Sequence, residues 1–192
     1  MCYNKSMEIK EIINPKEVIE KRIAETMGFP KYAKIVKELH NVNVSEDHLW
    51  QKNFNAFYRV RRNKDWQKIY YAIFEREKNK KPSFENILKE IYNKTGNIEA
   101  SFVSKMISTI DEDLPIWDQY VLSNLGLKLA GKSKEEKLQN AICVYNKIKC
   151  WYDEFVSSEQ GKNCIEEFDK VMPKYAWFSP IKKIDFFLWS MR

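Results

Sequence analysis

The chain has 192 residues, of which 44% are hydrophobic and 14% aromatic, enough apolar material for a sizeable core. Five glycines and six prolines are too few for the many tight turns of an all-β fold. No run is long and apolar enough to span a bilayer, and the first residues lack the apolar core of a signal peptide. We therefore expect a cytoplasmic protein with no membrane partner.

The net charge of +6 is concentrated in one stretch of the chain. Residues 51–100 hold 12 basic and 6 acidic side chains, whereas the rest of the chain is nearly balanced. Localised positive charge favours a polyanionic partner. We expect nucleic acid, either DNA or RNA, ahead of an acidic protein, and no motif specifies a protein partner.

Apolar residues recur at helical spacing almost throughout, which predicts an all-α fold of about nine helices. Ser45, Ser83 and Asp113 are the expected N-caps, and Gly28 and Gly96 the expected helix ends. The expected helical stretches, in chain order, are residues 15–27, 30–41, two apolar stripes at 50–58 and 66–74, 83–95, 98–110, 115–126, 133–157, 162–171 and a last helix after Pro180.

The domain prediction is one compact helical domain over residues 1–192. Within it, two sub-lobes are expected, residues 1–82 with 175–192 and residues 83–174. A cleft between two helical lobes is the expected place for a ligand.

The helix expected at 98–110 carries small polar side chains opposite its apolar side. Ser101, Ser104 and Lys105 would form a face of hydroxyls and one ammonium group that approaches a phosphate backbone closely. The alternative is an ordinary solvated face, with small residues where another helix crosses.

A second candidate is the basic group at the break between two apolar stripes, Arg59, Arg61, Arg62 and Lys64. These side chains could neutralise phosphates at a loop tip, or they could only solvate the outer face. The aromatic residues on either side of this group are spaced like a buried stripe, so we expect them in the core rather than stacked on nucleobases. They are Phe54, Phe57, Tyr58, Trp66, Tyr70 and Tyr71.

Asp118 lies three residues after Pro115, in the first turn of the helix expected there. The helix dipole would stabilise its ionised form. A carboxylate beside a cleft could activate water or oppose a developing cation. The alternative is a surface aspartate in a favourable helix position.

Residues 101–106 (SFVSKM) and 114–121 (LPIWDQYV) together resemble the core of the helix-hairpin-helix DNA glycosylase superfamily. The resemblance covers mainly residues 98–122 and implies an all-α glycosylase-like fold that grips DNA phosphates. It also implies that Asp118 orients a nucleophile and stabilises positive charge on the sugar while the base departs.

The chain departs from that family at two motifs. Residues 96–99 (GNIE) stand where the family has a glycine-rich hairpin, and Glu99 or Ala100 stands where bifunctional members have a lysine. Lys105 therefore does not take the Schiff-base role, and the resemblance implies a monofunctional enzyme that depends on Asp118 alone.

No cofactor or metal is expected. Cys143 and Cys150 match the first gap of the iron–sulfur motif found in some members of that family, but Asp153 stands at the next ligand position. Two histidines, neither near a cysteine in sequence, do not form a zinc motif. Four free thiols are expected.

Two functional hypotheses from different classes remain open. The first is a base-excision glycosylase that hydrolyses an N-glycosidic bond with Asp118. The second is a non-catalytic helical module that binds nucleic acid or a protein.

Overall fold

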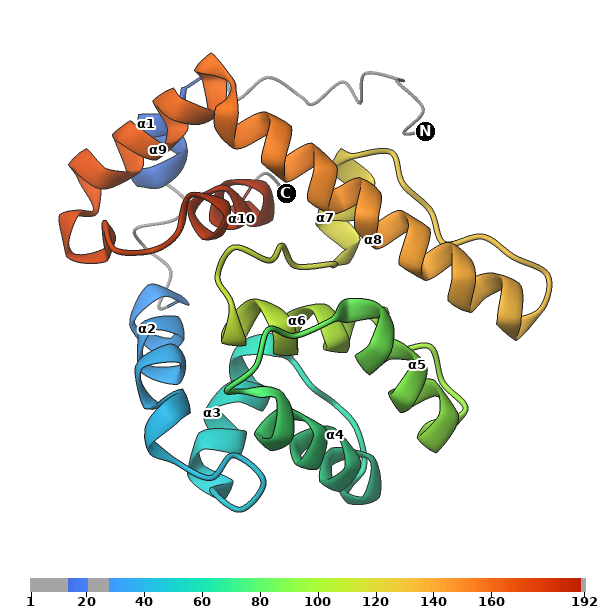
Figure 1. The fold of residues 1–192 in the computed structure, drawn as a ribbon. Helices are drawn as coiled ribbons and strands as arrows, with labels where there is room; N and C mark the ends of the chain where they lie inside the picture. The colour runs from blue at the N-terminus through green and yellow to red at the C-terminus, as the bar shows by residue number, and fades with distance from the viewer. Residues whose placement is uncertain (1–13, 21–27, 191–192) are drawn as a thin grey trace. The chain divides into compact units, whose positions relative to one another are not determined.

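The computed structural model describes residues 14–20 and 28–190, and within these ranges helices are the only regular elements, with no strand (Figure 1). The predicted all-α class is therefore confirmed. The described residues contain ten α-helices and two short 3₁₀ helices.

The chain forms two compact units. Unit 1 combines Met1–Thr26 with Glu112–Arg192, and unit 2 is Met27–Asp111. These boundaries differ from those of the sub-lobes expected from the sequence. Unit 2 holds 16 basic and 10 acidic residues, so it carries the whole net charge of +6.

Unit 2 is a bundle of five α-helices, coloured blue to green in Figure 1. Helix α2 packs against α3 and α6, α4 packs against α5, and α5 packs against α6. The elements are α2 (Gly28–Glu38), η2 (Leu39–Asn41), α3 (His48–Tyr58), α4 (Lys64–Glu77), α5 (Phe84–Thr95) and α6 (Ala100–Ile110).

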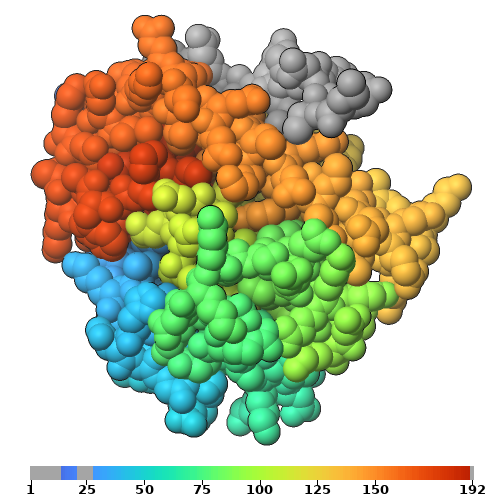
Figure 2. Space-filling model, in the orientation of Figure 1, coloured from blue at the N-terminus to red at the C-terminus, as the bar shows by residue number. Residues whose placement is uncertain are grey.

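Aromatic rings fill the centre of unit 2. Trp50 stacks on Phe54 with 5.2 Å between ring centroids, and Phe74 meets both of them edge-on at 5.4 and 5.5 Å. Tyr70 and Tyr71 complete the cluster, and all five residues are almost fully buried. Figure 2 shows side chains filling the spaces between the blue-to-green helices. The prediction that these aromatics belong to the core is confirmed.

The buried tyrosines make the stability of unit 2 sensitive to alkali. Burial raises the pKa of Tyr71, and burial together with the negative charges of its neighbours raises that of Tyr70. The native state therefore keeps protons that the unfolded chain loses near its ordinary pKa of 10.0.

We expect each of these tyrosines to lower the free energy of unfolding by about 1.4 kcal/mol per pH unit above about pH 10, with their full contribution present below it. Urea unfolding at about pH 9 and about pH 11 measures this. Tyr71→Phe should be less stable at the lower pH, because Tyr71 Oη donates to Asn55 Oδ1 at 2.6 Å. It should also show a shallower pH slope than wild type, and an equal slope would contradict the assignment.

The other helices of unit 1 pack around its last two helices, α9 and α10. Helix α9 packs against α1, α8 and α10, and α10 also packs against α7 and α8. The elements are α1 (Pro15–Val18), α7 (Gln119–Asn124), α8 (Lys134–Ser157), α9 (Glu159–Val171), η3 (Pro173–Tyr175) and α10 (Pro180–Ser190), with α7 to α10 coloured yellow to red in Figure 1.

Three helix boundaries follow their sequence signals. Ser83 accepts a hydrogen bond from the backbone N–H of Asn86 and begins α5, and Gly96, at a φ of 70°, ends it. Ser133 caps α8 in the same way through the N–H of Glu136. The two helices begin where a serine hydroxyl accepts a hydrogen bond from an otherwise unbonded backbone N–H. Helix α5 ends where glycine adopts the left-handed conformation.

Other boundaries differ from the prediction. Asp47, not Ser45, caps α3 by accepting from the N–H of Trp50 at 2.8 Å. Gly28 begins α2 rather than ending the preceding helix, and the part of that helix predicted at residues 21–27 lies outside the described residues. The predicted helix at 162–171 begins earlier, at Glu159, because Ser158 caps it.

None of the described helices combines the length and the apolar character needed to cross a membrane. Cys143 and Cys164 are free thiols, while Cys2 lies outside the described residues.

Candidate functional site

The connection between α3 and α4 presents a group of cations on the surface of unit 2. We call residues 59–64 the cationic loop. Arg59, Arg61, Arg62 and Lys64 are all exposed, and between them Val60 is buried and anchors the loop. Arg59, Arg61 and Lys64 form no ion pair with any described residue.

Arg59 occupies a backbone position that normally belongs to glycine. It ends α3 with a φ of 55°, and among the described residues it is the one non-glycine with a positive φ. The Val60 N–H bonds to the Asn55 carbonyl at 3.0 Å, which is the long closing bond of a Schellman motif. An arginine at this position costs backbone energy that glycine would not. The local fold therefore gives no reason for a guanidinium there.

Arg62 differs from the other three cations of the loop. Its Nη2 lies 2.9 Å from Glu99 Oε2, and Glu99 is only 5% exposed. The guanidinium carbon also lies 5.9 Å from the centre of the Trp66 ring and 5.3 Å from that of Phe102. Arg62 therefore ties the loop to the beginning of α6. No local sequence pattern indicates this contact, because Arg62 and Glu99 are 37 residues apart.

Elsewhere in unit 2, six of the twelve cations form ion pairs with carboxylates of described residues. Arg76, for example, contacts both Glu77 and Glu90. The acidic residues of unit 2 engaged in ion pairs are Glu38, Glu75, Glu77, Glu85, Glu90 and Glu99. The cationic loop stands out because three cations that pair with no described carboxylate, Arg59, Arg61 and Lys64, lie within six residues of one another.

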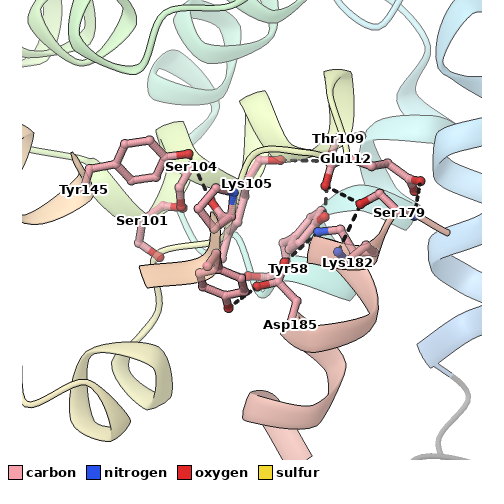
Figure 3. A network of polar contacts seen from close by, with 12 residues as sticks. Tyr58, Ser101, Ser104, Lys105, Thr109, Glu112, Tyr145, Ser179, Lys182 and Asp185 are labelled. Atoms are coloured by element: carbon pink, nitrogen blue, oxygen red, sulfur yellow. Dashed lines mark hydrogen bonds and ion pairs between the residues drawn. The ribbon is translucent and has the colours of Figure 1, made fainter. Parts of the chain in front are cut away.

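The serine face expected on α6 is not exposed as a whole. Ser104 is 0% exposed, and its hydroxyl donates to the Ser101 carbonyl at 2.9 Å (Figure 3). Ser101 itself is half-buried. The expectation of an accessible hydroxyl at Ser104 is wrong, because small residues on this helix are used for close packing.

Lys105 is half-buried, and its ammonium group donates to the Tyr58 carbonyl at 3.2 Å (Figure 3). It also lies 5.2 Å from the centre of the Phe102 ring. Because Tyr58 is the last residue of α3, Lys105 satisfies a carbonyl at the end of that helix, next to the cationic loop.

Asp118, in unit 1, is half-buried and is the N-cap of α7. Its Oδ1 accepts from the backbone N–H groups of Tyr120 at 2.8 Å and Val121 at 2.9 Å. The helix expected from Pro115 with Asp113 as cap is therefore wrong in its first turn. Pro115 instead lies in an extended segment, and its carbonyl accepts from the Tyr145 hydroxyl at 3.1 Å.

Unit 1 also contains a buried polar network that the sequence analysis missed. Lys182 Nζ lies 2.9 Å from Asp185 Oδ2, and the Tyr152 hydroxyl donates to Asp185 Oδ1 at 2.5 Å (Figure 3 labels Lys182 and Asp185). Lys182 is 2% exposed and Asp185 7%. Burial, and then the carboxylates of Asp185 and Asp118, hold the pKa of Tyr152 well above its usual range. The i, i+3 spacing of Lys182 and Asp185 was the signal that could have revealed the pair.

Ser179 holds the beginning of α10, next to Lys182. The Ser179 hydroxyl donates to the Glu112 carbonyl at 2.7 Å and accepts from the Lys182 backbone N–H at 3.1 Å. Lys182 is thus held from its backbone as well as through its side chain.

Comparisons with known proteins return nothing: no family model, no curated protein and no solved structure matches the chain. Among the described residues, no three histidine, cysteine, aspartate or glutamate side chains are grouped so that they could hold a metal ion.

Proposed function

We propose that the protein binds nucleic acid, DNA in the first instance, through the cationic loop of unit 2. The observation that carries this proposal is a group of three exposed cations that pair with no described residue, Arg59, Arg61 and Lys64, together with the backbone conformation of Arg59, which favours glycine. A non-glycine residue kept in a costly conformation supports a function for its side chain. Phosphate contacts from such residues supply affinity that does not depend on sequence.

Arg59→Gly separates binding from folding. We expect this variant to be as stable as wild type or more stable by up to about 1 kcal/mol, because glycine adopts a positive φ without strain. At the same time, its affinity for a short DNA duplex should fall, and the slope of log K against log salt should become shallower by about one. Fluorescence anisotropy over a salt series and urea unfolding measure the two effects.

A matched control is Lys81→Gln, which removes one exposed cation from the same unit. Lys81 follows the far end of the 14-residue helix α4, about 20 Å along that helix from Lys64. Its loss should weaken binding much less than the loss of Arg59. Equal weakening by the two variants would mean that binding follows total charge and not the loop.

We propose hydrolysis of an N-glycosidic bond by Asp118 as a second candidate function. Its support is the half-buried position of this carboxylate in unit 1, close enough to the buried network to raise the pKa of Tyr152. A charged group in such surroundings can oppose positive charge on a sugar.

Asp118→Asn tests this second candidate cleanly, since asparagine caps a helix as well as aspartate does and the fold should persist. If Asp118 is catalytic, cleavage across a panel of duplexes with damaged bases should fall by at least about a hundredfold. A protein that cleaves none of them, or a variant that cleaves as fast as wild type, removes catalysis and leaves the binding function.

For location, we propose the cytoplasm. The free thiols of Cys143 and Cys164 suit a reducing compartment.

A further inference from the structure

Two buried polar atoms of unit 2 lack hydrogen-bond partners beside the cationic loop. They are Glu99 Oε1, an acceptor, and Trp66 Nε1–H, a donor, and neither bonds to any described residue. Glu99 is 5% exposed and Trp66 7%. Buried polar atoms are rarely left unpaired without a reason, and a bound ligand is one such reason.

Both atoms belong to residues that contact a single guanidinium. Arg62 forms an ion pair with Glu99 and lies over the Trp66 ring. Its side chain is 44% exposed, so it lies between the buried carboxylate and solvent. If Arg62 turned outward from its loop, Glu99 and Trp66 would be uncovered together.

Phe102 adds an aromatic surface to this group. Its ring is half-buried, lies 5.2 Å from the Trp66 ring, and has the charges of Arg62 and Lys105 at 5.3 and 5.2 Å. A flat ring beside cations is the usual combination for stacking a base next to its phosphate.

From this arrangement we propose that Arg62, Trp66, Glu99 and Phe102 form a site for one unpaired nucleobase of a bound strand. The amino or imino N–H of the base edge donates to Glu99 Oε1, and the adjacent acceptor of the base receives Trp66 Nε1–H. Arg62 leaves Glu99 and forms an ion pair with the phosphate of the same nucleotide instead. The phosphate then takes the place of the carboxylate on the guanidinium, and the base N–H gives the Glu99 carboxylate a hydrogen-bond donor in place of the guanidinium.

This inference rests on the proposed function, and the test separates the two. Two single-stranded oligonucleotides of equal length are compared, one with bases and one abasic throughout, so that the phosphates are identical. Wild type should bind the strand with bases on the order of tenfold more tightly. Glu99→Gln removes the negative charge and one of the two acceptor oxygens, so this ratio should fall to about twofold while affinity for the abasic strand is kept.

Two further variants and a folding check are needed to interpret the ratio. Glu85→Gln removes an exposed carboxylate from α5 of the same unit and should leave the ratio unchanged. Phe102→Leu keeps an apolar side chain without the ring and should lower the ratio on its own, and thermal unfolding checks that both site variants fold.

Each outcome decides the matter. Equal binding of the two strands by wild type, with a normal salt dependence, would mean that a resident water alone satisfies the two buried atoms, and the base site is overturned while phosphate binding stands. A ratio that survives in Glu99→Gln and Phe102→Leu would place base stacking elsewhere. Binding of free mononucleotides as tightly as the strand would overturn the assignment to a strand, and no binding of any probe would overturn the proposed function itself.

Discussion

Lys182→Met is expected to lower the free energy of unfolding by about 3–5 kcal/mol. The substitution leaves the Asp185 carboxylate buried, with the Tyr152 hydroxyl as its remaining hydrogen-bond donor among the contacts described above. Methionine fills nearly the same volume, so the loss reports the uncompensated charge and not a cavity. Urea unfolding followed by tryptophan fluorescence measures it, with Trp151 of unit 1 as a buried reporter.

The neighbouring residue provides a control of the same chemistry. Lys183 is also buried and lies 2.6 Å from Asp169 Oδ1, but the Asp169 side chain as a whole is 38% exposed, against 8% for that of Asp185. Lys183→Met should therefore cost much less, about 1 kcal/mol. The double variant Lys182→Met/Asp185→Leu should recover most of the stability, because replacing a buried pair by apolar residues is often neutral. Equal losses for Lys182→Met and Lys183→Met would contradict this view of the network.

Gly161→Ala is expected to destabilise unit 1 by about 3 kcal/mol. Gly161 lies in the first turn of α9, where its N–H donates to the Ser158 hydroxyl at 3.0 Å. A Cβ built there would lie 1.9 Å from the Phe155 carbonyl oxygen, which is backbone at the end of α8 and cannot move without opening the turn between the two helices. Thermal unfolding measures the loss.

Gly126→Ala separates this contact from the general cost of replacing a glycine. Gly126 has a φ of 62°, and a Cβ there would meet nothing within 4 Å. Alanine at this position should cost about 1 kcal/mol through backbone strain alone. A Gly161→Ala protein as stable as Gly126→Ala would show that α8 and α9 are not held as closely as the structure describes.

Local signals explain why much of the fold could be predicted from the sequence. Ser83, Gly96 and Ser133 act on backbone groups within a few residues, and their helices begin or end where expected. The segment after Asp111 was mistaken because Pro115 is a common first helical residue, whereas here its carbonyl is held by Tyr145, which is 30 residues away. A distant partner of this kind leaves no trace in local sequence.

The candidate sites were harder to predict from the sequence than the helix boundaries, for the same reason. A helical wheel separates apolar from polar residues, but it does not show that Ser104 packs as a small residue in a buried position. It also treats Lys182 and Asp185 as surface residues, since charges are buried only when they are paired. The four cations of the loop were found from sequence, but only the structure distinguishes Arg62, held by Glu99, from Arg59, Arg61 and Lys64.

The salt dependence of DNA binding tests the central claim most directly. For wild type, log K against log salt between about 50 and about 200 mM should have a slope near −3. Each of the three loop cations that pair with no described residue displaces about one counterion. The double variant Arg59→Gly/Arg61→Gln should have a slope near −1 and an unchanged fold. A wild-type protein that binds no DNA at the lowest salt, or a double variant with the wild-type slope, would contradict the proposal that the cationic loop is a nucleic-acid interface.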